Sequence, residues 1–384
     1  MYKISTLNKI SPVGLANLTA NYIVCDDAAE ADGILVRSAD MHEMEFGDKL
    51  KAIARAGAGV NNIPLDKCAE SGIVVFNTPG ANANAVKELV LCGLFLAARN
   101  IPAALNWVNA LDSKDGDIGK AVEKGKSQFA GNEIMGKTLG VVGLGAIGRK
   151  VAAAASALGM NIVGYDPFFT PEGGEIKAYK DLTEMLPVCD YVTLHLPAND
   201  STKGMVNAEF FGAMKDGSVL LNFSRDKLVN EADLFAALDS GKLAKYVSDF
   251  ANDNVLGHEH TIFLPHLGAS TAEAEDNCAT MAVNEMRNYL ENGNIINSVN
   301  FPKLDMGELA GGTRIALMVK DMADPLTDVL ELIAPANVNV SKVMASRRED
   351  GIAYILIETP DTDLPALLFK GEQGSKVIGY RVIK

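Results

Sequence analysis

The stretch that decides the fold is TLGVVGLGAIGRKVAAAASALGMNIVGYD, residues 138–166. Its apolar start, residues 138–142, is typical of a buried strand, and its alanine-rich middle, residues 146–158, predicts a helix. Residues 162–165 predict a second strand. A strand, a glycine-rich turn, a helix and another strand in this order indicate a parallel βαβ unit.

Three glycines, Gly143, Gly145 and Gly148, mark the turn between the first strand and the helix. The first allows a tight turn, the second lets backbone N–H groups approach a pyrophosphate, and the third lets the helix pack closely on the sheet. The helix starts at Ala146 and Ile147, where its free N–H groups offer partial positive charge to phosphates. The pattern therefore predicts a dinucleotide site.

Asp166 ends the second strand, about 20 residues beyond the turn. Its carboxylate would accept hydrogen bonds from the adenosine ribose hydroxyls and would repel a 2′-phosphate, so we predict NAD rather than NADP. Such a turn can also occur without a ligand, but having all four elements in register favours the dinucleotide site.

Composition limits the class of protein. A chain of 384 residues is expected to form two or three domains. Its formal net charge of −14 argues against nucleic acid as a partner, because binding a phosphate backbone takes clustered basic residues. An anionic substrate must therefore be met by a local group of Arg or Lys side chains.

The five cysteines lack C-x-x-C spacing, so we expect buried thiols in a reducing cytosol rather than disulfides. The N-terminus, MYKISTLNKI, lacks the apolar segment of a signal peptide. The longest strongly apolar run, residues 89–98, is about half the ~20 residues that a membrane span needs. We expect a soluble, cytoplasmic protein with no membrane partner, and we assign no metal site.

Alternation of strands and helices organises the rest of the chain. Before the central stretch, strands are expected at 34–36, 52–54 and 73–76, followed by a helical pattern from about 83 to 111 that could bridge two domains. After it we expect strands at 191–196, 218–222 and 246–248, helices at 181–186, 207–214 and 231–238, and a long helix at 271–292. The tail predicts strands at 314–319, 338–343, 353–358 and 377–383, with one helix at 326–333 and another after residue 358.

The fold class is therefore α/β, with two doubly wound parallel-sheet domains and a small ferredoxin-like βαββαβ domain. We expect a discontinuous substrate domain (1–99 and 268–300), a Rossmann NAD-binding domain (100–267), a linker (301–312) and a C-terminal domain (313–384).

Hydride transfer from a hydroxy acid also needs a cation for the carboxylate and an acid–base group for the hydroxyl proton. Arg225 follows a predicted strand, where the carboxyl end of a sheet meets the ligand crevice. His266, in FLPHLGAST, likewise ends an apolar run. From spacing alone, a solvated Arg and a structural His are the commoner interpretations of such residues.

Several blocks, in order, resemble the D-isomer-specific 2-hydroxyacid dehydrogenases. They are VVGLGAIGRKVAAAASALGMNIVGYDP, CDYVTLHLPANDSTKGMVNAEFF and MKDGSVLLNFSRDKLVNEADL, with ARAGAGVNNI and FNTPG before them and LPHLGAST after them. The resemblance covers about residues 34–301. The tail after INSVNFP resembles an ACT domain, which points to the branch that oxidises 3-phosphoglycerate to 3-phosphohydroxypyruvate, the entry to serine synthesis.

The resemblance implies that Arg225 holds the substrate carboxylate and carbonyl and that His266 accepts the proton. It implies further cofactor positions at His195, Pro197, Thr202, Phe223, Ser224, Asp249 (near the nicotinamide amide) and Gly268. For the substrate it implies a backbone nest at Ala58, Gly59 and Val60, with Asn77 nearby, and a phosphate site at Arg37 and Arg55. Members of the family are commonly homodimers through the NAD domain, and the tail could extend this to a homotetramer.

The sequence departs from the family at the partner of the catalytic histidine. The family places a Glu five residues after Asp249, whereas this chain has Asn254, with Asp253 beside it. Either Asp253 reaches His266, or the pair works without a carboxylate, since Asn supplies no negative charge. We favour the second hypothesis, and we expect Asn254→Glu to raise the pKa seen in the pH profile of kcat/KM.

Further departures concern the substrate side and the tail. Asp226 and Lys227 follow Arg225 where the family has a Gly pair, and we expect Asp226 to point to solvent. The loop at 320–325 lacks the effector residues of serine-sensitive relatives and retains only Asn339, which argues against serine feedback and favours a dimerisation role for the tail.

Two alternatives to the 3-phosphoglycerate reaction stay open. One is another substrate on the same scaffold: 2-hydroxyglutarate, glyoxylate or hydroxypyruvate. The other is a non-catalytic NAD-sensing scaffold, as in the corepressors that resemble this family.

Overall fold

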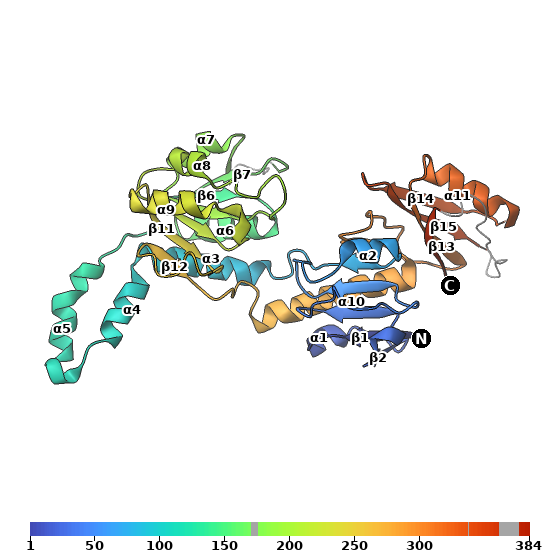
Figure 1. Cartoon of the computed structure of the whole chain (residues 1–384), viewed down its shortest axis with the longest axis horizontal. Coiled ribbons are helices and arrows are strands. Elements are labelled where there is room, and N and C mark those ends of the chain that lie inside the picture. Colours follow the sequence, from blue (N-terminus) through green and yellow to red (C-terminus); the bar gives the residue numbers. More distant parts are fainter. Residues whose placement is uncertain (170–175, 337, 361–375) are drawn as a thin grey trace. The chain divides into compact units, whose positions relative to one another are not determined.

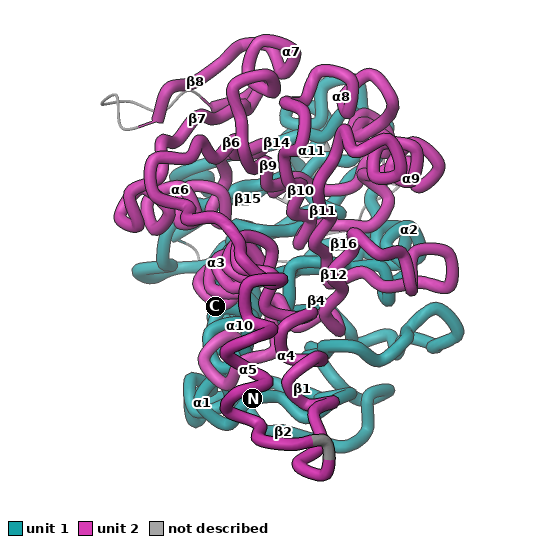
Figure 2. The backbone as a smooth tube through the Cα atoms, turned by 90° about the vertical axis from the view of Figure 1, so that its left-hand side faces the viewer, with its two compact units in different colours: residues 1–81, 275–384 teal, residues 82–274 magenta. Residues whose placement is uncertain are grey.

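The computed structural model describes residues 1–169, 176–336, 338–360 and 376–384 (Figure 1). The chain forms two compact units (Figure 2). Unit 1 contains residues 1–81 and 275–384, and unit 2 contains residues 82–274. The first unit is thus discontinuous. Residues 82–99 belong to unit 2, whereas the expected domain boundary is at residue 99.

Unit 1 contains a five-stranded parallel sheet in the order β2-β1-β3-β4-β5. The strands are β1 (Tyr2–Thr6), β2 (Tyr22–Cys25), β3 (Gly33–Val36), β4 (Ala52–Arg55) and β5 (Val74–Phe76). Their helices are α1 (Pro12–Leu15), α2 (Leu65–Glu70) and α10 (Ala272–Asn292), the last of which begins in unit 2. Strands β3, β4 and β5 match the predicted ones, whereas β1 and β2 were not predicted.

The tail of unit 1 forms a four-stranded antiparallel sheet in the order β14-β15-β13-β16. Its elements are β13 (Thr313–Lys320), α11 (Pro325–Ile333), β14 (Lys342–Arg347), β15 (Ile352–Thr359) and β16 (Val377–Ile383). This strand order confirms the ferredoxin-like prediction. The strand expected at 338–343 instead begins at Lys342, and the second predicted helix lies outside the described residues.

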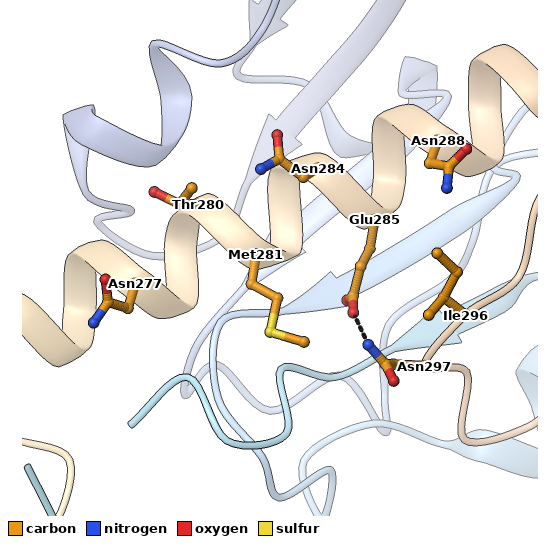
Figure 3. Close-up of a pocket in the computed structure, with 8 residues that line it drawn as sticks. All are labelled: Asn277, Thr280, Met281, Asn284, Glu285, Asn288, Ile296 and Asn297. Carbon is orange, nitrogen blue, oxygen red and sulfur yellow. Dashed lines mark hydrogen bonds between the residues drawn. The ribbon is translucent and has the colours of Figure 1, made fainter. Parts of the chain in front are cut away.

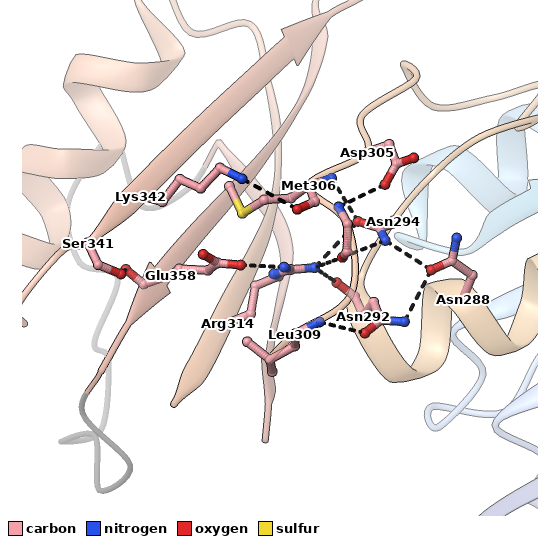
Figure 4. Close-up of polar contacts among 11 residues, drawn as sticks. Asn288, Asn292, Asn294, Asp305, Met306, Leu309, Arg314, Ser341, Lys342 and Glu358 are labelled. Atoms are coloured by element: carbon pink, nitrogen blue, oxygen red, sulfur yellow. Dashed lines mark hydrogen bonds and ion pairs between the residues drawn. The ribbon is translucent and has the colours of Figure 1, made fainter. Parts of the chain in front are cut away.

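A buried arginine joins this tail to the end of α10 (Figure 4). Arg314 is fully buried, and its Nη1 donates to the carbonyl oxygens of Asn292 at 2.6 Å and Gly307 at 2.9 Å. Its Nη2 forms an ion pair with Glu358 on β15. The segment expected to be a linker is therefore held in place, and its Phe301, Leu304 and Met306 side chains are buried in the same core as α10.

Unit 2 contains a seven-stranded parallel sheet in the order β12-β11-β10-β9-β6-β7-β8. Its strands are β6 (Thr138–Val142), β7 (Asn161–Tyr165), β8 (Lys177–Tyr179), β9 (Tyr191–Leu194), β10 (Ser218–Asn222), β11 (Leu243–Ser248) and β12 (Thr261–Phe263). Its helices are α3 (Ala83–Ala98), α4 (Ile101–Asn109), α5 (Ile118–Gly125), α6 (Ala146–Ala157), α7 (Leu182–Met185), α8 (Ala208–Ala213) and α9 (Glu231–Asp239). The predicted doubly wound parallel sheet is confirmed, and β8 and β12 extend it at its two edges.

The prediction of one helix over residues 83–111 is wrong. The chain breaks between α3 and α4 at Asn100, whose φ of 52° is left-handed, and Pro102 follows in the first turn of α4. The two helices meet at a bend of 70°. Within the described part of the chain, no single helix is long and apolar enough to cross a membrane, although this bent pair passes by length and composition.

All five cysteines are free thiols. Cys68, Cys189 and Cys278 are buried as expected, and Cys25 is half-buried. Cys92 is exposed, because it lies on the outer face of α3 despite its apolar sequence neighbours.

We predict that Arg314→Met destabilises the chain by about 3 kcal/mol, because it leaves a half-buried carboxylate and two carbonyl oxygens without their donor. Urea unfolding monitored by circular dichroism measures the change. Arg347→Met, on the exposed side of β14, is the matched control and should change stability by no more than about 0.5 kcal/mol. Equal effects of the two substitutions would contradict the assignment.

Candidate active site

Most of the predicted cofactor and catalytic residues lie at one edge of the unit 2 sheet. Because all seven strands are parallel, their carboxyl ends meet at that edge. The residues that follow successive strands there are Gly143 (after β6), Asp166 (β7), His195 (β9), Arg225 (β10), Asp249 (β11) and His266 (β12). The order of the strands reverses between β6 and β9, which is where such sheets bind ligands.

The glycine-rich turn has the geometry that the sequence predicts. Gly143 has a φ of 95°, and a Cβ atom there would lie 2.4 Å from the carbonyl oxygen of His195. A Cβ atom on Gly148 would lie 1.9 Å from the carbonyl oxygen of Gly143. At Gly145, which precedes α6, an added Cβ would meet no atom within 4 Å. The turn therefore leaves open space before the free N–H groups of α6, as a pyrophosphate requires.

Asp166 is held by two backbone donors. Its Oδ2 accepts a hydrogen bond from the N–H of Leu144, and its Oδ1 accepts one from the N–H of Phe168, each at 2.8 Å. The carboxylate is thus fixed next to the glycine-rich turn. Its negative charge suits ribose hydroxyl donors and opposes a 2′-phosphate, so these residues fit NAD.

Two other predicted cofactor residues use their side-chain hydroxyl groups to hydrogen-bond to the backbone near the carboxyl ends of the strands. Ser224 Oγ donates to the carbonyl oxygen of Leu194 at 2.5 Å, and Thr202 Oγ1 donates to that of Pro197 at 2.6 Å. The Phe223 side chain is buried in the core of unit 2, so only its backbone could meet a ligand.

His195 is oriented by a hydrogen bond of 3.0 Å between its Nε2 and Thr193 Oγ1. Burial lowers its pKa to about 3, so the ring is neutral at pH 7. A neutral ring adds no charge beside the dinucleotide, which fits a role in lining the cofactor cleft and does not suit a general base working near neutral pH.

Arg225, Asp249 and His266 influence one another electrostatically. Asp249 is 2% exposed, and burial raises the pKa of its carboxyl, while the charges of His266 and Arg225 lower it. Its backbone carbonyl accepts from the His266 N–H at 3.0 Å, and its Oδ2 accepts from the Gly268 N–H at 3.3 Å. The two predicted catalytic residues therefore both lie within electrostatic range of one buried carboxyl group.

His266 itself lies in a constrained loop. Its φ of 25° is unusual for a residue with a side chain, and its ring packs on that of Phe250, with 4.8 Å between the centroids. Both ring nitrogens are available, because no described residue hydrogen-bonds to them. Backbone strain at an exposed histidine is typical of functional sites. Asp226, which follows Arg225, is exposed to solvent as expected.

Asn254 is the predicted site residue that the structure does not place beside His266. Its Nδ2 donates to Glu231 Oε2 at 2.9 Å, and Asn252 donates to the other oxygen of the same carboxylate at 2.6 Å. Within the described residues, neither Asn254 nor Asp253 hydrogen-bonds to His266. The loop is therefore held against the start of α9, and this geometry gives Asn254 no contact with the predicted catalytic His266.

The predicted substrate residues lie in unit 1, at the carboxyl ends of its strands. Arg37 follows β3 and Arg55 ends β4, and Arg55 Nε donates to the Arg37 carbonyl oxygen at 3.0 Å. Ala58, Gly59 and Val60 form the half-buried loop after β4. Asn77, after β5, supports that loop by donating its Nδ2 to the Ala58 carbonyl oxygen at 2.6 Å.

Two acidic residues of these sites were not found from the sequence. Glu231 accepts a hydrogen bond from Asn254, and Glu275 on α10 forms an ion pair with Arg37 at 2.6 Å. Glu231 begins a helix and Glu275 lies within one. The sequence around each residue is ordinary for a helix, so it gives no sign of a role in a site. The contacts exist only because distant segments meet in the fold. Within the described residues, no group of three or more His, Cys, Asp or Glu could hold a metal ion.

Comparison with known proteins places these features in a family. Residues 92–268 match the family model "D-isomer specific 2-hydroxyacid dehydrogenase, NAD binding domain". The D-3-phosphoglycerate dehydrogenase of Haemophilus influenzae is 30% identical over 351 residues, which cover 88% of this chain and 83% of that one. The chain therefore belongs to the D-isomer specific 2-hydroxyacid dehydrogenase family, and unit 2 contains its NAD-binding domain.

Other relatives are longer than this chain. The D-3-phosphoglycerate dehydrogenase of Methanocaldococcus jannaschii is 33% identical over 85% of this chain, and that of Rattus norvegicus is 36% identical over 68% of it. The chain spans 63% and 49% of their respective lengths.

Solved structures show the same architecture. The NAD⁺-bound 3-phosphoglycerate dehydrogenase of Entamoeba histolytica aligns with a TM-score of 0.63 at 28% identity, covering 78% of this chain and 98% of that one. A glyoxylate reductase of Paecilomyes thermophila aligns with a TM-score of 0.65 at 24% identity, with the same coverage of both chains, and shows a shared fold.

We predict that Asp166→Asn weakens NAD binding about tenfold or more, because hydrogen bonds to a charged acceptor are worth about 1.5–3 kcal/mol. The same substitution should improve NADP binding by removing the charge repulsion. Calorimetric titration with each cofactor measures both changes. Asp216→Asn, in an exposed ion pair at the other end of β10, is the control and should bind NAD normally. An unchanged ratio of the two affinities would contradict the role of Asp166.

We further predict that Asn254→Glu raises the pKa of His266 in a Glu231→Gln background, which removes like-charge repulsion at the loop. A carboxylate near the imidazole stabilises its charged form. NMR titration of the His266 ring measures the shift, with Asp253→Asn as the control that should leave the pKa in place. An unshifted pKa in the double variant would refute the idea that this position can act on His266.

Proposed function

We propose that this chain catalyses the NAD-dependent oxidation of D-3-phosphoglycerate to 3-phosphohydroxypyruvate. The observation that supports this most directly is the pairing of Arg37 and Arg55 at the ends of adjacent strands β3 and β4. They provide local positive charge in a chain whose net charge is −14, and guanidinium groups suit a phosphate better than any other side chain. Relatives at 30–36% identity carry the corresponding name.

The chemistry follows from the residues at the carboxyl end of the unit 2 sheet. Bound NAD would accept the hydride that leaves C2 of the substrate. A ring nitrogen of His266 takes the hydroxyl proton, so that the C2 hydroxyl becomes a carbonyl and charge is balanced. The Arg225 guanidinium polarises that oxygen and holds the carboxylate. In unit 1, the backbone N–H groups of residues 58–60 offer donors that suit a carboxylate.

A different 2-hydroxy acid is favoured by one observation. Arg37 already pairs with Glu275 at 2.6 Å, and this ion pair reduces the positive charge available to a phosphate dianion. A substrate with a single additional carboxylate, such as D-2-hydroxyglutarate, would require less charge. The two candidates differ in how strongly turnover depends on the phosphate group.

We also propose that the chain forms a homodimer in the cytoplasm. Helices α4 and α5 extend from unit 2 as a hairpin (Figure 1), and α4 has no buried residue. Its Leu105 and Val108 side chains are exposed, and the Trp107 ring packs at a tilt of 45° against Phe129, with 5.3 Å between the centroids. An apolar helix of this kind suits a second copy of the same surface.

We predict that the chain reduces NAD with D-3-phosphoglycerate and that His266→Ala lowers kcat about 10²- to 10⁴-fold, the range expected for losing a general base. NAD affinity, measured by calorimetry, should stay unchanged, which separates this effect from misfolding. Spectrophotometric NADH formation gives the rates.

Arg55→Met tests the substrate. It should lower kcat/KM for D-3-phosphoglycerate at least tenfold more than for D-glycerate, which lacks the phosphate. Lys51→Met, at the opposite end of β4, is the control. Equal losses for both substrates would favour the unphosphorylated alternative, and no turnover of any 2-hydroxy or 2-oxo acid would favour the sensing scaffold.

A further inference from the structure

A pocket in unit 1 is not used by the proposed reaction. It lies between α10 and the segment that follows it, and its volume is about 430 Å³ (Figure 3). Six of its eight lining residues carry an amide, hydroxyl or carboxyl group: Asn277, Thr280, Asn284, Glu285, Asn288 and Asn297. The other two are Met281 and Ile296. A pocket of this size accommodates a small molecule.

Glu285 is the charged group of this pocket. Its side chain points from α10 toward Asn297 (Figure 3), and the residue is 8% exposed. Oε1 accepts a hydrogen bond from Asn297 Nδ2 at 2.5 Å. Oε2 is buried, and no described residue donates to it. Burial raises the pKa of this carboxyl to about 7, against the lowering effect of the Asn297 hydrogen bond.

The lining determines which ligand would suit the pocket. It contains no Lys, Arg or His, so its one formal charge is negative. The amides offer both donors and acceptors, and Met281 and Ile296 offer contact for a short carbon chain. A divalent metal prefers several anionic oxygens, and only one carboxylate is present. An N–H donor that also carries positive charge is the complement of an unpaired buried carboxylate oxygen.

Asn297 connects the pocket with the loop predicted to bind the substrate. Its backbone carbonyl accepts from the Asn77 N–H at 3.4 Å, and Asn77 Nδ2 donates to the Ala58 carbonyl oxygen at 2.6 Å. A ligand that binds Oε2 of Glu285 shares this carboxylate with Asn297, which donates to Oε1. Three hydrogen bonds in series therefore link Glu285 to the loop at residues 58–60.

We propose that this pocket binds a small primary ammonium compound through Glu285, and that its occupancy changes the affinity of the loop at residues 58–60 for the substrate. The binding step is independent of the proposed function. The effect on substrate affinity rests on that function, so the two are measured separately.

Ethanolammonium chloride is the probe for binding, and tetramethylammonium chloride is its matched control, since it carries the same charge without an N–H donor. Calorimetric and thermal-shift titrations of the full chain should show saturable binding of ethanolammonium only. Glu285→Gln should weaken that binding about tenfold or more, because it removes a charge-assisted hydrogen bond. Glu308→Gln, an exposed glutamate in the same unit, should bind as the wild type does.

If Glu285→Gln fails to fold, Asn297→Ala takes its place, since it releases the same carboxylate from its internal partner and should alter ethanolammonium affinity. A wild-type response no greater than that to tetramethylammonium, or equal affinity in the wild type and both variants, overturns the binding site. Ethanolammonium should also change KM for the substrate and leave kcat in place. Binding without a change in KM overturns the coupling, whereas a chain without turnover fails the proposed function and leaves the binding result standing.

Discussion

The cofactor side of the molecule depends on one close approach, between the backbone of Gly143 and the carbonyl oxygen of His195. A side chain at Gly143 would place its Cβ 2.4 Å from that oxygen, and the φ of 95° is itself unfavourable for other residues. The contact seats the ends of β6 and β9 against each other where the strand order reverses. It also leaves the start of α6 free to meet a pyrophosphate, so cofactor binding and sheet geometry have the same origin.

The positive charge of the predicted sites comes from a few arginines at the sheet edges and not from the net charge of the chain. The chain is acidic, yet Arg225 lies at the sheet edge of unit 2, and Arg37 and Arg55 lie at that of unit 1. Two of the three act on a carboxylate: the charge of Arg225 influences Asp249, and Arg37 pairs with Glu275. Such a carboxylate holds the arginine side chain in position before a substrate binds, but it also weakens the affinity of that arginine for an anionic substrate. The loop at residues 252–254 is fixed in the same manner by Glu231.

The parts of the fold that were predicted correctly are those with local signals. The turn at residues 143–148 and Asp166 follow from spacing, because glycine conformation and strand length are properties of neighbouring residues. The prediction of a single helix over residues 83–111 was wrong. The apolar periodicity of the sequence continues through Asn100 and Pro102, but the left-handed backbone at Asn100 ends the helix there. Strand β1 was missed because its sequence, YKIST, mixes apolar and polar residues. Strand β2, YIVC, was missed although it is apolar; it lies at the edge of the sheet and is only partly buried. The contacts Arg37–Glu275 and Asn254–Glu231 depend on tertiary packing alone and could not be predicted from the sequence.

The most direct test of the account uses D-3-phosphoglycerate that carries deuterium at C2. If hydride leaves C2, the purified chain transfers the label to NAD, and mass spectrometry finds deuterium in the reduced cofactor. The L isomer, labelled in the same way, should give no reduced cofactor. Transfer from both isomers, or reduced cofactor without deuterium, would contradict the proposed hydride transfer at this site.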